Sequence, residues 1–191
     1  MVSMRWIGLF IAFFCGTAVA QDLDINLSND TAEVKFEAPI ASTGVGRSSF
    51  DLDLLYADQK VDNNWLTGVG YTVSGNAGRD VPGLKFGVGV KAYVLEVARF
   101  DVSALTLGGQ FRYSPPANNR LFLFGSLYGS PRITTFNDAD KFYNAFVVLG
   151  YEILPSAQLY GGYRNIEADL IGSRPSVSVD EGWLVGVKLK F

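Results

Sequence analysis

Histidine is absent from this sequence of 191 residues, and cysteine occurs once, as Cys15. Imidazole serves as general base, nucleophile activator and metal ligand in most enzyme sites, so its absence argues against hydrolytic and transition-metal chemistry. A catalytic serine would need a lysine as its base, and no Ser–Lys spacing stands out. We therefore expect no enzymatic activity, no catalytic residue, no metal and no cofactor.

A positive charge excess is also lacking. The formal net charge is -3, which argues against a polyanion-binding surface, so nucleic acid is not an expected partner. Beyond residue 20 there is neither a helical period nor an apolar run of the roughly 20 residues that a transmembrane helix needs. No α-helical membrane span is expected there.

The first 20 residues are typical of a secretory signal peptide. Arg5 supplies the positive region, residues 6–14 form the apolar segment, and an Ala-Val-Ala sequence ending at Ala20 forms the cleavage site. The apolar run is short for an uncleaved anchor helix, which is the alternative. Cleavage near Ala20 leaves residues 21–191 as one domain without cysteine, as suits an oxidising compartment.

Short segments in which apolar and polar residues alternate follow one another along this domain, as in an all-β barrel or sandwich. The segment at 120–129 is apolar on both faces, so its orientation is not predicted. A connector is expected at 38–46 and a polar loop at 130–140. We predict ten strands, at 22–27, 32–37, 48–57, 65–74, 84–94, 105–113, 120–129, 142–152, 158–167 and 181–191. The alternative is an eight-strand barrel with the first hairpin outside the wall.

The segment at 181–191 carries the clearest pattern. One face runs unbroken from Trp183 to Phe191, and the other carries glycine and lysine. The closing strand of a bacterial outer-membrane barrel commonly ends in such a phenylalanine, so Phe191 is a candidate assembly signal. Both termini would then be periplasmic. The links at 58–64, 99–101, 130–140 and 169–179 would be extracellular, and the turns at 75–83, 114–119 and 154–156 periplasmic.

Two arguments favour apolar faces that point to lipid over a soluble periplasmic barrel with apolar faces turned inward. Aromatic residues eight positions apart on one face span roughly 20 Å of a tilted strand, close to the ~25 Å band between aromatic girdles. The girdle candidates are Trp65, Tyr113, Tyr143, Tyr151, Trp183 and Phe191. Charged residues lie on the opposite face, toward the lumen. The candidates for a lumen charge network are Asp51, Asp53, Lys91, Arg112, Arg164 and Lys188.

These charges could select a solute or line a pore, although salt bridges that fill a narrow barrel are the favoured interpretation. Residues 137–140 offer carboxylate oxygens to a cation, but they lack the glycine and distant glutamate of a calcium loop. Gly87 and Gly89 lie within a strand and open no helix, so they are not a nucleotide-binding motif.

Several stretches resemble YfaZ-type outer-membrane proteins of Gram-negative bacteria. They are residues 24–30 (DINLSND), 112–116 (RYSPP), 151–155 (YEILP), 160–169 (YGGYRNIEAD) and the closing strand. The resemblance covers most of the domain and implies an outer-membrane β-barrel. It implies no reaction or ligand, so it brings no catalytic residue to this sequence.

We therefore expect an antiparallel up-and-down transmembrane β-barrel of structural or surface-interaction type in the outer membrane. A narrow channel, a transporter of lipids or hydrophobic solutes, and a soluble periplasmic binding barrel are the alternatives. Expected partners are outer-membrane lipid and, during biogenesis, the barrel assembly machinery and periplasmic chaperones. The barrel is expected to be a monomer.

Overall fold

The computed structural model describes residues 21–43, 46–58, 63–78, 81–97, 100–137, 139–170 and 176–191. Strands account for almost all of this chain, because apolar and polar residues alternate along it with period two. The strands are β1 (Asp22–Leu27), β2 (Thr31–Ser42), β3 (Gly46–Asp58), β4 (Asn63–Asn76), β5 (Leu84–Val97), β6 (Phe100–Tyr113), β7 (Leu121–Ser130), β8 (Thr135–Asn137), β9 (Ala139–Leu154), β10 (Ala157–Leu170) and β11 (Val177–Lys190), with a 3₁₀ turn, η2 (Arg132–Thr134), before β8. No helix in these ranges is long and apolar enough to cross a membrane.

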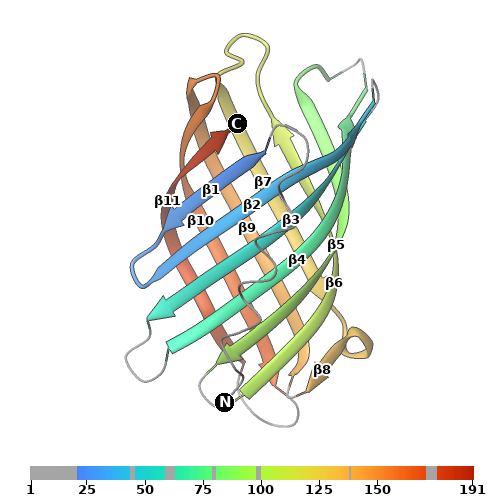
Figure 1. Cartoon of the computed structure of the whole chain (residues 1–191), viewed down its shortest axis with the longest axis vertical. Coiled ribbons are helices and arrows are strands. Elements are labelled where there is room, and N and C mark those ends of the chain that lie inside the picture. Colours follow the sequence, from blue (N-terminus) through green and yellow to red (C-terminus); the bar gives the residue numbers. More distant parts are fainter. Residues whose placement is uncertain are drawn as a thin grey trace.

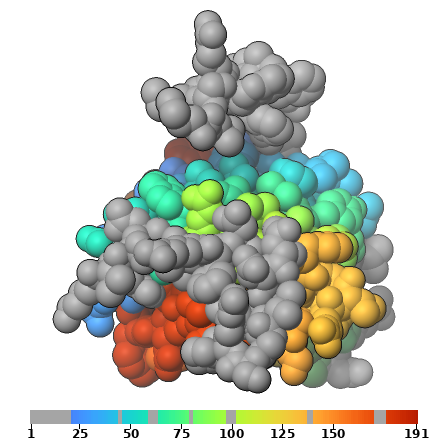
Figure 2. Space-filling view, turned by 90° about the horizontal axis from the view of Figure 1, so that it is seen from below, coloured from blue at the N-terminus to red at the C-terminus, as the bar shows by residue number. Residues whose placement is uncertain are grey.

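The strands close into an antiparallel barrel with ten positions in its wall (Figure 1). Each strand pairs with the next along the chain, except that β7 pairs with β9 and the short β8 pairs with β6. β1 closes the ring by pairing with β11, from Asp22 opposite Lys190 to Leu27 opposite Val185. Seen along the long axis, the strands of the amino-terminal half (blue to green) and those of the carboxyl-terminal half (orange to red) occupy different sides of the barrel (Figure 2). The prediction of ten strands is confirmed. The eight-strand alternative is wrong, because β1 and β2 belong to the wall.

One position of the wall is shared by β7 and β8. The half of β6 from Leu107 to Tyr113 pairs with β7, and residues 102–104 pair with β8. Between the two strands the chain makes the turn η2, where Ser130 Oγ lies 2.7 Å from Thr135 Oγ1. The stretch at 130–140, predicted as a polar loop, is therefore partly wall.

Two other predicted boundaries differ from the structure. The connector expected at 38–46 is shorter, because β2 continues to Ser42. Pro39 has no N–H to donate, and the register between β2 and β3 shifts there, between Pro39 and Ala41. The closing strand begins at Val177 and not at Glu181, so the preceding link is shorter than predicted.

The apolar faces point outward. In β4, Trp65, Val69 and Val73 are exposed, whereas their neighbours Leu66 and Thr72 are buried. The same alternation runs along β3, β5, β9 and β11. In β7 it resolves the orientation that the sequence left open, since Phe122 and Tyr128 are buried and Leu127 is exposed. A soluble barrel would show the opposite arrangement.

The two ends of the barrel differ in what they carry. At the end that we call the terminal mouth, Gln21 and Phe191 exchange two backbone hydrogen bonds, of 3.1 and 2.8 Å. The turns after β2, β4, β6 and β9 lie at this end, and the carboxyl terminus is near the top of Figure 1. The loop mouth, at the other end, carries the links after β1, β3, β5, β7 and β10. The assignment of the terminal mouth to the periplasm stays a prediction.

Candidate functional site

Apolar side chains fill the lumen toward the loop mouth. Leu55, Leu66, Leu95 and Val102 are direct register neighbours across β3, β4, β5 and β6, and each is at most 2% exposed. We call the whole cluster the apolar plug. It comprises Leu55, Ala57, Leu66, Tyr93, Leu95, Val102, Ala104, Phe142, Ile166, Ala168 and Val179. These residues come from seven strands, so the cluster reaches around most of the barrel.

One aromatic pair within the plug joins two strands that are not neighbours in the wall. The ring of Tyr93 on β5 lies 5.1 Å from the ring of Phe142 on β9, measured between centroids. The side-chain amide of Asn144 donates to the Tyr93 hydroxyl at 3.4 Å. β5 and β9 are three positions apart in the wall, so this contact runs through the lumen between strands that do not pair.

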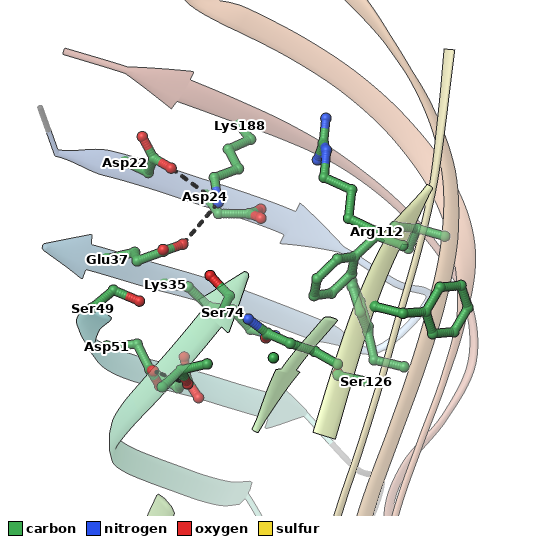
Figure 3. A pocket seen from close by; sticks show the side chains of 18 of the residues that line it. Asp22, Asp24, Lys35, Glu37, Ser49, Asp51, Ser74, Arg112, Ser126 and Lys188 are labelled. Atoms are coloured by element: carbon green, nitrogen blue, oxygen red, sulfur yellow. Dashed lines mark hydrogen bonds and ion pairs between the residues drawn. The ribbon is translucent and has the colours of Figure 1, made fainter. Parts of the chain in front are cut away.

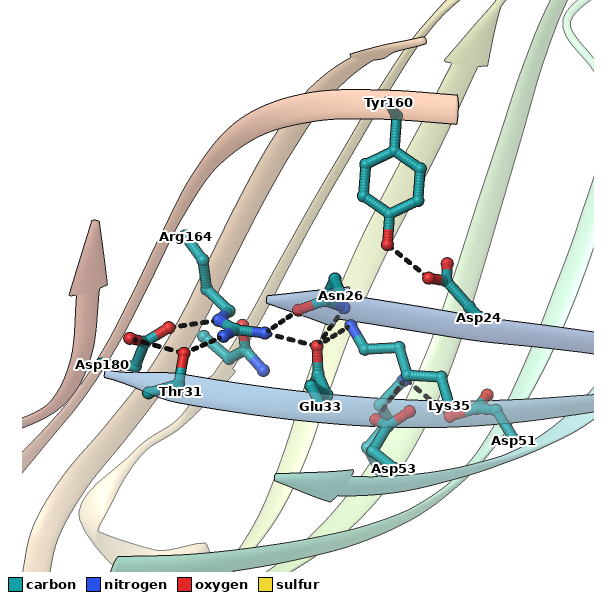
Figure 4. Close-up of polar contacts among 12 residues, drawn as sticks. Asp24, Asn26, Thr31, Glu33, Lys35, Asp51, Asp53, Tyr160, Arg164 and Asp180 are labelled. Atoms are coloured by element: carbon teal, nitrogen blue, oxygen red, sulfur yellow. Dashed lines mark hydrogen bonds and ion pairs between the residues drawn. The ribbon is translucent and has the colours of Figure 1, made fainter. Parts of the chain in front are cut away.

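A buried arginine lies beside the plug. Arg164 of β10 is fully buried, and its guanidinium donates to Asp180 of β11, Glu33 and Thr31 of β2, and Asn26 of β1 (Figure 4). The bonds to Asn26 and Thr31 are both 2.9 Å. We call these five residues the arginine cluster. The arginine cluster joins the four strands where the barrel closes, so it holds the barrel together at this seam.

The next charged group toward the terminal mouth is centred on Lys91 of β5. Its ammonium lies 2.6 Å from Asp51 and 3.1 Å from Asp53, both on β3. It also lies 5.1 Å from the ring centroid of Tyr128, on β7. Thr72 donates to Asp51 at 3.4 Å. The lysine is therefore neutralised by two carboxylates and held over an aromatic ring.

A third charged group lies at the terminal mouth. Lys188 of β11 is 3.2 Å from Asp22 and 3.0 Å from Glu37 (Figure 3). Arg47 of β3 approaches the same two carboxylates at 4.0 and 3.8 Å. Two cations thus share two carboxylates across the strands β1, β2, β3 and β11.

A cavity of about 290 Å³ occupies the lumen on the terminal side of the plug, and we call it the vestibule. Its two sides differ in chemistry. The strands β1, β2 and β3 contribute carboxylates and lysine, whereas β7, β9 and β10 contribute the packed aromatic cluster of Phe122, Phe146 and Tyr160. Where the two sides meet, Lys35 lies 4.6 Å from the Phe146 ring centroid, and Tyr160 donates a hydrogen bond to Asp24.

Positive charge predominates in the vestibule, although the whole chain carries a net charge of -3. Among the described residues that line it, seven are cationic and five are anionic. The cations are Lys35, Arg47, Lys85, Lys91, Arg112, Lys188 and Lys190, and the anions are Asp22, Asp24, Glu37, Asp51 and Asp53. The vestibule is therefore better suited to a negatively charged group than the protein surface as a whole.

Arg112 differs from the other charged residues predicted for the lumen. Its guanidinium carbon lies 3.8 Å from the ring centroid of Phe122. Within the described part of the chain, no carboxylate lies within 4.0 Å of it. In Figure 3, Arg112 stands apart from the ion pairs of Lys188.

The structure places all six predicted network residues in the lumen, but in separate groups. Asp51, Asp53 and Lys91 meet, whereas Arg164, Lys188 and Arg112 each lie elsewhere. Most of their partners were not among the predicted residues, namely Asp22, Asn26, Thr31, Glu33, Glu37 and Asp180. The alternation in β1 and β2 already put Asp22, Glu33 and Glu37 on the charged face, and that signal could have found them.

The predicted girdle residues are on the outer face in two groups. Trp65, Tyr143 and Trp183 lie toward the loop mouth, and Trp183 packs against Tyr163 with ring centroids 5.8 Å apart. Tyr113, Tyr151 and Phe191 lie toward the terminal mouth. Trp183 and Phe191 are 75% and 71% exposed, so these large apolar rings face the surroundings of the barrel.

The predicted loop at 137–140 falls partly outside the described residues, because Asp138 is not among them. Asp140 forms an ion pair with Arg132 at 3.1 Å. The described ranges hold no group of three or more acidic, histidine or cysteine side chains arranged to bind a metal.

A comparison with models of protein families identifies the family of this chain. The model of the YfaZ precursor family matches residues 9–191, which is nearly the whole chain. The chain belongs to the YfaZ precursor family. No curated protein matches the chain.

Two solved structures are similar to this YfaZ family chain. The NanC porin has a TM-score of 0.51 and 13% identity, with 91% of this chain and 100% of the porin chain covered. A chain from work on the in meso crystallization of membrane proteins has a TM-score of 0.45 and 11% identity, with 90% and 82% covered. The likeness to the porin supports the barrel fold and nothing finer.

Proposed function

We propose that this protein is an exported, non-enzymatic barrel of the outer membrane, of structural or surface-interaction type and without an open pore. The observation that carries the proposal is the outward apolar face of the closed barrel. Val88, Leu107, Leu127, Val147 and Val185 come from five strands and are each 45–70% exposed. A contiguous apolar surface of this extent is unfavourable in water and favourable in lipid.

The outer positions between the two groups of girdle residues support the same location. They carry apolar or aromatic residues, glycine or threonine in the described strands, and outward charges such as Asp58, Glu96, Lys141, Glu167 and Glu181 lie toward the loop mouth. A lysine or arginine at mid-depth on the lipid side would cost about 2–4 kcal/mol. The distribution of charge therefore leaves a band that suits the hydrocarbon core.

The lack of an enzymatic role rests on the lumen chemistry. The chain has no histidine, and Lys91 and Lys188 are each held by two carboxylates. A lysine ammonium held by two carboxylates is a poor candidate for a general base. This arrangement supports a structural role for the lumen charges, as in a barrel whose interior is mostly filled by side chains.

A narrow channel is the second candidate, and the polar lining of the vestibule favours it. The apolar plug argues against it in the conformation described, because its side chains pack across the lumen between the vestibule and the loop mouth. A channel would require these side chains to move.

Fractionation of cells that express the whole precursor tests the proposal. The protein is expected in the outer-membrane fraction, and its gel mobility is expected to change on boiling, because a closed barrel resists unfolding by detergent. A soluble periplasmic protein without a heat-dependent shift would contradict the proposal.

Deletion of Phe191 tests the proposed contact with the assembly machinery. The Phe191 backbone closes the seam with Gln21, and its exposed ring is free to be recognised. The truncated chain should insert less efficiently than a Phe191→Tyr control, which keeps an aromatic ring. Equal insertion of the two variants would remove Phe191 as the assembly signal.

A further inference from the structure

Two cations face each other at the terminal mouth. Lys85 near the start of β5 is the register partner of Arg112 near the end of β6. Both residues line the vestibule. Like charges directly opposite each other on adjacent strands are destabilising, so this pair needs an explanation.

The strand ends that carry the pair are held together. The Ser114 N–H donates to the Gly83 carbonyl at 2.9 Å, which joins the turn before β5 to the end of β6. Gly83 has a φ of 87°, a conformation that favours glycine. The two backbones are thus fixed side by side, and they cannot separate to relieve the repulsion.

The neighbouring carboxylates are engaged with other groups. Asp22 and Glu37 share Lys188 and Arg47, and Glu152 lies 3.7 Å from Lys190. No carboxylate of the described chain lies within 4.0 Å of Lys85 or of Arg112. Neither cation forms an ion pair with a carboxylate of the described chain, and the charges of Glu152, Asp22 and Glu37 act on Arg112 only from farther away. The pair lies at the edge of a cavity that water can enter.

Arg112 is also held in position. Its guanidinium lies over the face of Phe122, at 3.8 Å from the ring centroid. Phe122 packs against Gly150, where even a Cβ atom would collide with the ring. A guanidinium held by its face leaves its N–H edges available, and this planar set of donors matches a carboxylate or phosphate group.

We propose that Lys85 and Arg112 form an oxyanion site that binds one phosphate or carboxylate group in the vestibule. The group enters from the terminal mouth and lies between the ammonium and the guanidinium. Its charge relieves the repulsion between the two cations. The site belongs to the lumen and does not depend on the membrane location proposed above. The group can come from a dissolved anion or from the head group of a lipid beside the mouth.

Calorimetric titration of the refolded protein with inorganic phosphate, in an uncharged detergent, tests the site. The expected result is saturable binding that Lys85→Gln and Arg112→Gln each weaken roughly tenfold or more, because a charge-assisted hydrogen bond is lost. The matched control is Arg120→Gln. Arg120 lies at the same mouth in the turn before β7 but is exposed and does not line the vestibule.

Phosphate binding in Arg120→Gln should stay within about twofold of the unchanged protein, since general attraction at the mouth is weak and screened by salt. The proposal is overturned if the unchanged protein does not bind phosphate saturably, or if Arg120→Gln loses as much affinity as Arg112→Gln. Retention of the heat-dependent gel shift in each variant separates loss of the site from loss of the fold.

Reconstitution into vesicles distinguishes the two sources. Phosphate binding is compared in phosphatidylcholine alone and with added phosphatidylglycerol. Competition by phosphatidylglycerol that is the same in the unchanged protein and in Arg120→Gln, but is lost in Arg112→Gln, supports the site with a lipid head group as its source. Equal binding in both vesicles supports it with a dissolved anion.

Discussion

Toward the loop mouth the lumen is filled by leucine, valine and phenylalanine side chains, with Arg164 surrounded by its partners. Toward the terminal mouth the lumen holds a cavity lined by charged residues, two of which, Lys85 and Arg112, lack a counter-ion in the described chain. The two halves share one wall and one hydrogen-bond pattern. The comparison shows that side chains alone decide which half of this barrel is sealed and which is open to solvent.

The largest contrast between the halves is expected in chemical access. Residues 21–191 contain no cysteine, so a single introduced thiol can be followed. Ser126→Cys in the vestibule should react with a membrane-impermeant maleimide, whereas Ala104→Cys in the plug, at 2% exposure, should stay unlabelled until the protein is denatured. Mass spectrometry measures the labelled fraction. Equal labelling of the two sites would remove the distinction between the halves.

The second contrast concerns the charges themselves. Arg164→Ala leaves Glu33 and Asp180 buried without their cation, and loss of one partner of a buried ion pair costs about 3–5 kcal/mol. Arg112→Ala, the matched substitution in the vestibule, removes a cation without a carboxylate partner and should cost far less. Urea unfolding followed by tryptophan fluorescence gives both free energies. Equal losses would show that the two arginines do not differ in role.

A third test compares the inner and outer faces of the wall. Leu66→Ala opens a cavity in the plug and should lower the free energy of unfolding by about 2–4 kcal/mol. Leu107→Ala truncates a side chain that is 70% exposed on the outer face, where detergent or lipid fills the space, so a smaller loss is expected. If Leu107→Ala were the more destabilising change in the same urea titration, the plug would not be the packed core of the barrel.

The smallest effect is expected at the cation pair. Lys85→Glu converts like charges into an opposite-charge pair with Arg112, which should stabilise the barrel by about 0.2–1 kcal/mol in low salt. Lys85→Gln removes the repulsion without adding attraction, so its free energy of unfolding should lie between that of the unchanged protein and that of Lys85→Glu. A loss of stability in Lys85→Glu would mean that Lys85 has an anionic neighbour.

Much of the wall could be predicted from the sequence, because charged residues identify the inward face of a strand. Asp51, Asp53 and Lys91 each alternate with apolar neighbours, and a one-residue change of register would expose them to lipid. The number of strands and the outward direction of the apolar faces followed from this pattern. Both are confirmed.

The plug was not predicted, because alternation between apolar and polar residues stops near the loop mouth. Leu54 and Leu55 are adjacent, as are Trp65 and Leu66, and one residue of each pair faces outward while the other faces inward. The recurrence of such pairs at the same end of successive strands is the signal that was available. The orientation of β7 could not be predicted because apolar and aromatic residues such as Phe122 also face the lumen there.

The ion pairs of the lumen could be predicted only in part. The sequence shows which charged residues face inward but not which of them meet, because contacts such as Lys188 with Glu37 join segments far apart in the chain. The 3₁₀ turn before β8 also left no clear pattern, since three residues are too few to establish alternation.

The measurement that tests the central claim most directly is the conductance of the refolded protein in a planar lipid bilayer. A lumen sealed by the apolar plug predicts no discrete current steps for the unchanged protein. Phe142→Ala, which removes the ring that meets Tyr93 across the lumen, should make such steps appear. Stable steps of uniform size from the unchanged protein, at the same frequency as from Phe142→Ala, would contradict the account of a barrel closed at one end.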